Sequence, residues 1–213
     1  MSWSLTDISD AVSTGLRARA QSDDLAQVVY GFDTEDELGL HPLIQDSLRS
    51  VGYGVWPEQR YPGHWNRSRR SEGLRCDLVL THRGLPLRDP EIKNTIFDCL
   101  EAEDPQSAFW LEIKTVAQFE TDGPFRRYSS ELFSPVTRDV RKIWNDGLIR
   151  CGGLLLVLFT QGQVVADHDL TAWQRRCLDR GYPIGPPVVR GFPILDRIGN
   201  NWCAVAAFSV RGG

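Results

Sequence analysis

Two copies of the tripeptide Glu-Ile-Lys, at residues 91–93 and 112–114, each place an acid and a lysine two positions apart. On a helix such residues point about 200° apart, whereas on a strand they project from the same face. The first copy follows an Asp-Pro pair that predicts the beginning of a helix, so Glu91 and Lys93 are expected to be separate, solvated charges. The second copy lies in SAFWLEIKTV, whose aromatic and β-branched residues predict a strand. Only Glu112 and Lys114 are therefore expected to form a convergent pair.

A third acid, Asp77, lies in the equally apolar segment RCDLVLTH, which predicts a buried strand. Charges in such strands are costly to bury without partners. If the two strands are neighbours, Asp77 and Glu112 can hold one hard divalent cation through oxygen ligands, as Mg²⁺ prefers. Lys114 would then lie beside the attacking water and stabilise charge that develops on a phosphate. The alternative is that each strand has one wet face and that these charges are only solvated.

The periodicity of the chain predicts one α/β domain without repeats or linkers, of the size that 213 residues allow. The apolar spacing and the helix-capping signals predict helices at residues 5–30, 34–50, 135–147 and 168–180. Apolar runs predict strands at residues 54–60, 75–81, 109–116, 153–160 and 201–210. Residues 63–74 and 119–133 are expected to be loops.

This order of elements, with an acid on the second strand and E-x-K on the third, resembles the PD-(D/E)XK nuclease superfamily. The resemblance covers residues 34–160 and implies the restriction-endonuclease-like fold, a mixed central sheet with an α-β-β-β-α-β core flanked by helices. Residues 1–33 would then be an N-terminal helical extension, and residues 161–213 a C-terminal elaboration with one helix and one strand. A cysteine, Cys76, precedes Asp77 where the motif has proline.

The resemblance also implies roles for individual residues. Asp77 and Glu112 would be the metal ligands, with Mg²⁺ or Mn²⁺ as the cofactor, and Lys114 the catalytic lysine. Many members carry a further acid on the first core helix, which Glu37 matches in position, while Glu58 on the first strand is the competing candidate.

Arginines crowd into RYPGHWNRSRRSEGLR, residues 60–75. There Arg67, Arg69, Arg70 and Arg75 could neutralise phosphates and position a nucleic acid, or form an ordinary charged loop. Trp65 could stack on a base or simply anchor this loop. The histidines His41 and His168 lack partners at ligand spacing and are expected to be structural.

Composition narrows the function classes. A net charge of -4 does not by itself indicate a nucleic-acid-binding protein. Five widely spaced cysteines without a C-x-x-C pair argue against a zinc site or a disulfide framework. No apolar run approaches the roughly 20 residues that cross a bilayer, so no membrane partner is expected. The N-terminus lacks the features of a secretion signal, which favours a cytoplasmic location.

The sequence therefore predicts a Mg²⁺-dependent nuclease that acts on nucleic acid, with DNA as the expected substrate. Restriction, repair and phage-defence roles are all compatible with it, and so is a homodimer or a partner protein. The main alternative is an inactive nuclease-like module that binds nucleic acid or a protein partner. A third hypothesis is a different metal-dependent hydrolase that uses the same carboxylates.

Overall fold

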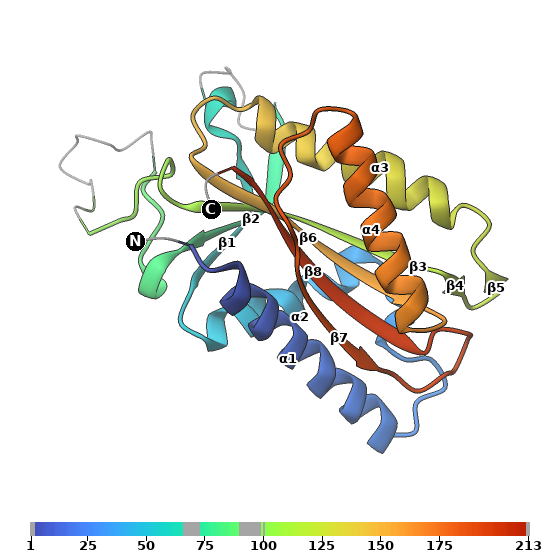
Figure 1. Cartoon of the computed structure of the whole chain (residues 1–213). Coiled ribbons are helices and arrows are strands. Elements are labelled where there is room, and N and C mark those ends of the chain that lie inside the picture. Colours follow the sequence, from blue (N-terminus) through green and yellow to red (C-terminus); the bar gives the residue numbers. More distant parts are fainter. Residues whose placement is uncertain (1–2, 66–72, 90–98, 100, 212–213) are drawn as a thin grey trace.

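Four helices cover the two faces of a central sheet in the computed structural model, which describes residues 3–65, 73–89, 99 and 101–211. Helices α1 (Leu5–Leu25) and α2 (Glu37–Ser50) lie on one face, and α3 (Tyr128–Asn145) and α4 (Gln163–Asp179) on the other (Figure 1). The predicted helix with Glu91 and Lys93 lies outside the described residues. Among the described helices, none has the length and apolar character that crossing a membrane requires.

The central sheet has six strands in the order β1-β2-β3-β6-β8-β7. Its strands are β1 (Gly54–Arg60), β2 (Arg75–Thr81), β3 (Phe109–Ala117), β6 (Cys151–Thr160), β7 (Val188–Pro193) and β8 (Trp202–Arg211). Only β3 and β6 pair in parallel; the other neighbours are antiparallel. Short strands β4 (Phe119–Glu120) and β5 (Gly123–Pro124) form a separate hairpin. The molecule is thus a mixed α/β protein, as the sequence predicts.

Alternating side chains of β3 enter two different cores. Leu111 and Ile113 pack with α1 and α2, whereas Trp110 packs with α3 and α4. Because the side chains of a strand alternate between faces, Glu112 and Lys114 share the α3 face. The prediction that this pair projects opposite Leu111 and Ile113 is confirmed.

Several predicted boundaries differ from the observed ones. The first helix ends at Leu25 and not at residue 30, and α2 is capped by Asp36, whose Oδ1 accepts a hydrogen bond from the Gly39 N–H. The predicted loop at residues 119–133 is wrong, because it contains the β4–β5 hairpin and the first turns of α3. Burial of Leu132 in the core favours this early start, although it places Pro135 inside the helix.

The C-terminal elaboration holds two strands where the sequence predicted one. The additional strand, β7, is an edge strand that ends at Pro193. Its glycine and terminal proline hide the strand pattern, although both are tolerated at an edge, where one side of the strand needs no ladder hydrogen bonds.

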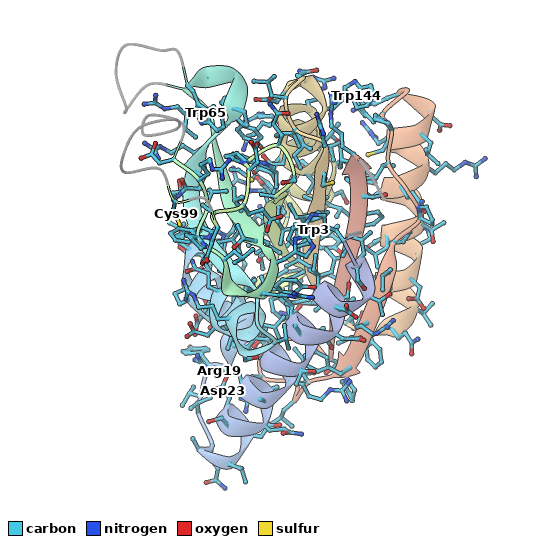
Figure 2. The ribbon with its side chains drawn as sticks, turned by 90° about the vertical axis from the view of Figure 1, so that its left-hand side faces the viewer. Trp3, Arg19, Asp23, Trp65, Cys99 and Trp144 are labelled. Carbon is cyan, nitrogen blue, oxygen red and sulfur yellow. The ribbon has the colours of Figure 1, made fainter. Side chains whose placement is uncertain are left out.

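Helix α1 fixes the segment that leads into α2. Arg19 and Asp23 lie together on α1 (Figure 2), with 2.8 Å between Nε and Oδ1. The same guanidinium contacts Glu35 Oε1 at 2.8 Å through Nη2, and Asp23 Oδ2 accepts a hydrogen bond from the Phe32 N–H at 2.9 Å. These contacts set where α2 begins, and therefore where Glu37 lies.

Candidate active site

Strands β2 and β3 are neighbours, as the interpretation of Asp77 and Glu112 requires. Their antiparallel ladder runs from Leu80 opposite Phe109 to Leu78 opposite Leu111 and ends there. Beyond the ladder, a side chain of β2 replaces the backbone as the hydrogen-bond acceptor for β3. The Asp77 Oδ2 accepts a hydrogen bond from the Ile113 N–H at 2.7 Å. Asp77 is therefore held where the two strands separate, directly beside the E-I-K segment.

Glu37 reaches this place from the first turn of α2. Its Oε2 lies 2.9 Å from Nζ of Lys114, and its Oε1 lies 3.2 Å from the same nitrogen. The Thr115 N–H also donates to Oε2, at 3.4 Å. Burial disfavours the ammonium form of Lys114, but the hydrogen bond and charge of Glu37 outweigh burial, so the pKa of Lys114 is raised. Lys114 is therefore a cation at neutral pH.

Glu112 lies deeper in the protein and is fully buried. Its Oε1 accepts a hydrogen bond from the Tyr61 hydroxyl, and its Oε2 lies 3.2 Å from Nζ of Lys142. Burial raises the pKa of Glu112 well above its ordinary value, and the Asp77 charge raises it further, while Lys142 opposes both. Asp77 and Glu112 are thus electrostatically coupled.

Asp139 on α3 links the two lysines. Its Oδ1 lies 2.8 Å from Nζ of Lys142, and its Oδ2 lies 3.8 Å from Nζ of Lys114. Burial disfavours the charge on Lys142, but Glu112 and Asp139 outweigh that effect and raise the pKa of this lysine. Every charged group that β3 contributes to the site therefore has a partner of opposite charge.

Three side chains in the described part of the chain offer ligand atoms for one metal ion. One carboxylate oxygen each from Glu37 and Asp77 and one ring nitrogen of His41 all lie within 4.8 Å of one another. Bonds of about 2.1 Å place the ligand atoms of an octahedral ion roughly 3 to 4 Å apart, so small side-chain shifts would complete such a site. Glu112 is not a member of this group, although the sequence pairs it with Asp77 as a ligand.

The expectation that His41 lacks a partner at ligand spacing is wrong. His41 follows Glu37 by four residues, and on a helix this spacing places both side chains on one face. The i, i+4 spacing of Glu37 and His41 is visible in the sequence. It indicates a metal site only once Asp77 is known to lie beside α2. His168, by contrast, is an exposed residue whose Nδ1 lies 2.9 Å from Asp169 Oδ1.

The predicted nucleic-acid contacts are only partly described. Arg67, Arg69 and Arg70 lie outside the described residues, and exposed Arg75 donates to the Glu58 carbonyl at 2.6 Å. Trp65 donates from Nε1 to the Arg60 carbonyl at 3.0 Å, a contact that anchors its loop. Glu58 itself is exposed on β1 and is not in the three-residue ligand group, so Glu37 is the acid that the fold brings to Lys114.

A cleft of about 530 Å³ opens beside Glu37 and Lys114, which are each about one-quarter exposed. Its charged lining is mainly acidic and comprises Asp33, Glu35, Asp36, Glu37, Glu120 and Glu131 against Lys114 and Arg127. Such a lining repels an approaching polyanion unless cations neutralise it.

Known proteins offer no guide to this site. No family model matches the sequence, and no curated protein or solved structure is significantly similar to the chain. The functional interpretation therefore rests on the geometry of Glu37, His41, Asp77, Glu112 and Lys114.

Proposed function

We propose that this protein is a metal-dependent nuclease of the restriction-endonuclease-like type, which hydrolyses phosphodiester bonds of nucleic acid, with DNA as the expected substrate. The observation that carries the proposal is the meeting of Glu37, Asp77 and Lys114. These residues come from α2, β2 and β3, yet Lys114 Nζ contacts Glu37 at 2.9 Å and Asp77 shares a ligand group with Glu37. The order of core elements, α2-β1-β2-β3-α3-β6, also agrees with that fold.

The donor set fits a divalent cation. Glu37 and Asp77 supply carboxylate oxygens, which Mg²⁺ and Mn²⁺ accept. A bound cation would supply Lewis acidity, polarising the phosphate and easing deprotonation of a water molecule.

The remaining residues would hold and balance this centre. Lys114, charged and partly exposed at the cleft, is placed to stabilise negative charge on the phosphate. Asp77 orients the E-I-K segment through its hydrogen bond to the Ile113 N–H. Glu112 is fixed by Tyr61 and Lys142, and the Asp77 charge contributes to the raised pKa of its carboxyl.

The acidic cleft favours a second candidate, the metal-dependent hydrolase of a small phosphodiester. Six carboxylates against two cations disfavour a long polyanion more than they disfavour a singly charged diester. An inactive nuclease-like module is a further alternative. Such a module would not need Lys114 in contact with Glu37, next to the second ligand carboxylate, Asp77.

The test is cleavage of supercoiled and linear DNA by purified protein in Mg²⁺, Mn²⁺ or EDTA, with bis-p-nitrophenyl phosphate as the small diester. We expect metal-dependent DNA cutting that Asp77→Asn abolishes. Asp46→Asn, which changes an exposed acid of α2 paired with Arg49, is the matched control and should cut normally. Hydrolysis of the small diester alone would favour the second candidate. DNA binding without hydrolysis in any metal would reject the nuclease and support the inactive module.

A further inference from the structure

His41 is a buried histidine with one ring nitrogen that makes no hydrogen bond to any described residue. The residue is 7% exposed on α2. Its Nε2 is buried and, within the described residues, has no hydrogen-bond partner. Native proteins rarely leave a buried polar atom unpaired, because the lost contact with water is not replaced. The described residues therefore leave this nitrogen without the partner that a buried polar atom requires.

The surroundings of the His41 imidazole favour a cation as a partner of the ring. A ring nitrogen of His41 lies within 4.8 Å of carboxylate oxygens from both Glu37 and Asp77. Two carboxylates and an imidazole together attract a cation, and the i, i+4 spacing on α2 holds Glu37 and His41 on the same helix face. Glu37 already binds one cation, the Lys114 ammonium.

We propose that His41 is a nitrogen ligand of the metal centre, which makes the site selective for a transition-metal ion over Mg²⁺. Mg²⁺ favours all-oxygen coordination, whereas Co²⁺, Zn²⁺ and, more weakly, Mn²⁺ gain from an imidazole ligand. The centre is the one invoked for the proposed nuclease, but the inference concerns metal binding and can hold even if DNA is not the substrate.

The experiment measures metal affinity and not activity. Metal-free protein is titrated with Co²⁺, followed by its visible absorption bands, and with Mg²⁺, followed by calorimetry. The variant His41→Phe keeps a ring in the buried space and removes the nitrogen. The ratio of Co²⁺ to Mg²⁺ affinity should fall about tenfold or more in this variant, since even outer partners of metal ligands contribute that much. His168→Phe, which changes the exposed histidine beside Asp169, should leave the ratio unchanged.

A second measurement does not depend on the variant folding. Pulsed electron paramagnetic resonance of the wild-type protein loaded with Mn²⁺ should show magnetic coupling to one imidazole nitrogen. An unchanged affinity ratio in folded His41→Phe, or no nitrogen coupling in the wild type, would overturn the inference. Neither result would contradict the nuclease proposal if the protein still cuts DNA. Conversely, nitrogen coordination without cleavage in any metal would support His41 as a ligand and reject the nuclease.

Discussion

The ammonium of Lys114 lies 2.9 Å from Oε2 of Glu37, a residue 77 positions earlier in the chain. The contact joins the middle of β3 to the first turn of α2, and Asp77 lies beside both. A cation is thus already present at the carboxylate that we propose as a metal ligand. Lys114 serves as the counterion of Glu37, and a metal ion would compete with it for the same oxygens.

Replacing Lys114 by methionine should separate its two roles. The variant loses the charge that stabilises the phosphate, so we expect DNA cleavage to fall by about 10²- to 10³-fold. It also frees Glu37, so Mg²⁺ should bind several times more tightly than in the wild type. Calorimetric titration and plasmid cleavage measure the two effects on one preparation. Weakened metal binding together with lost cleavage would argue that Lys114 only maintains the shape of the site.

Replacing Lys142 by methionine should destabilise the metal-free protein, because it leaves the fully buried Glu112 without its cationic partner. The expected cost is about 2 kcal/mol of unfolding free energy, less than for a fully buried pair because Lys142 is partly exposed. Urea denaturation in EDTA measures it. The double variant Lys142→Met/Glu112→Gln should recover part of the loss, since Glu112 then carries no buried charge, while buried Asp139 still lacks its contact with Lys142. A double variant no more stable than Lys142→Met would assign the loss to Asp139 or to packing, and not to Glu112.

Asp33, buried beneath the cleft, should make stability depend on pH. Burial raises the pKa of Asp33 from its ordinary value of 3.8, although Asn200 Nδ2 donates to its Oδ2 at 3.0 Å. The folded protein thus retains this proton at a pH where the unfolded chain has lost it. The stability from Asp33 is complete below the ordinary pKa and is lost as the pH rises through the raised folded value.

The variant Asp33→Asn removes this titration. Its unfolding free energy relative to the wild type should therefore increase from about pH 3 to about pH 7. Urea midpoints at several pH values provide the measurement, and parallel curves for the two proteins would contradict the prediction.

DNA binding should require a divalent cation, because the carboxylates that line the cleft outnumber its cations. We expect a labelled duplex to bind at least about tenfold more tightly in Ca²⁺ than in EDTA at matched ionic strength, as measured by fluorescence anisotropy. Replacing the exposed Glu120 and the half-buried Glu131 by glutamine should strengthen binding in EDTA. Equal affinity with and without Ca²⁺ would place the binding surface away from this cleft.

Local patterns were sufficient for much of the fold. Strands β1 and β2 occupy the predicted residues 54–60 and 75–81, because apolar runs between turn residues are read over short distances. The two-residue period of β3 correctly placed Glu112 and Lys114 on one face. Where burial in the assembled core outweighs a local signal, as in the turn of α3 before Pro135, the sequence pattern misled.

The sequence by itself therefore determined the elements and the residue types capable of metal chemistry, because periodicity and side-chain chemistry are local properties. Only the tertiary structure decided which residues meet. It paired β2 with β3, brought Glu37 and not Glu58 to Lys114, and placed Glu112 against Lys142 and Tyr61. It also brought Asp77 to the Glu37–His41 pair of α2. These contacts join segments dozens of residues apart, and the packing of α2 and α3 on opposite faces of the sheet creates them.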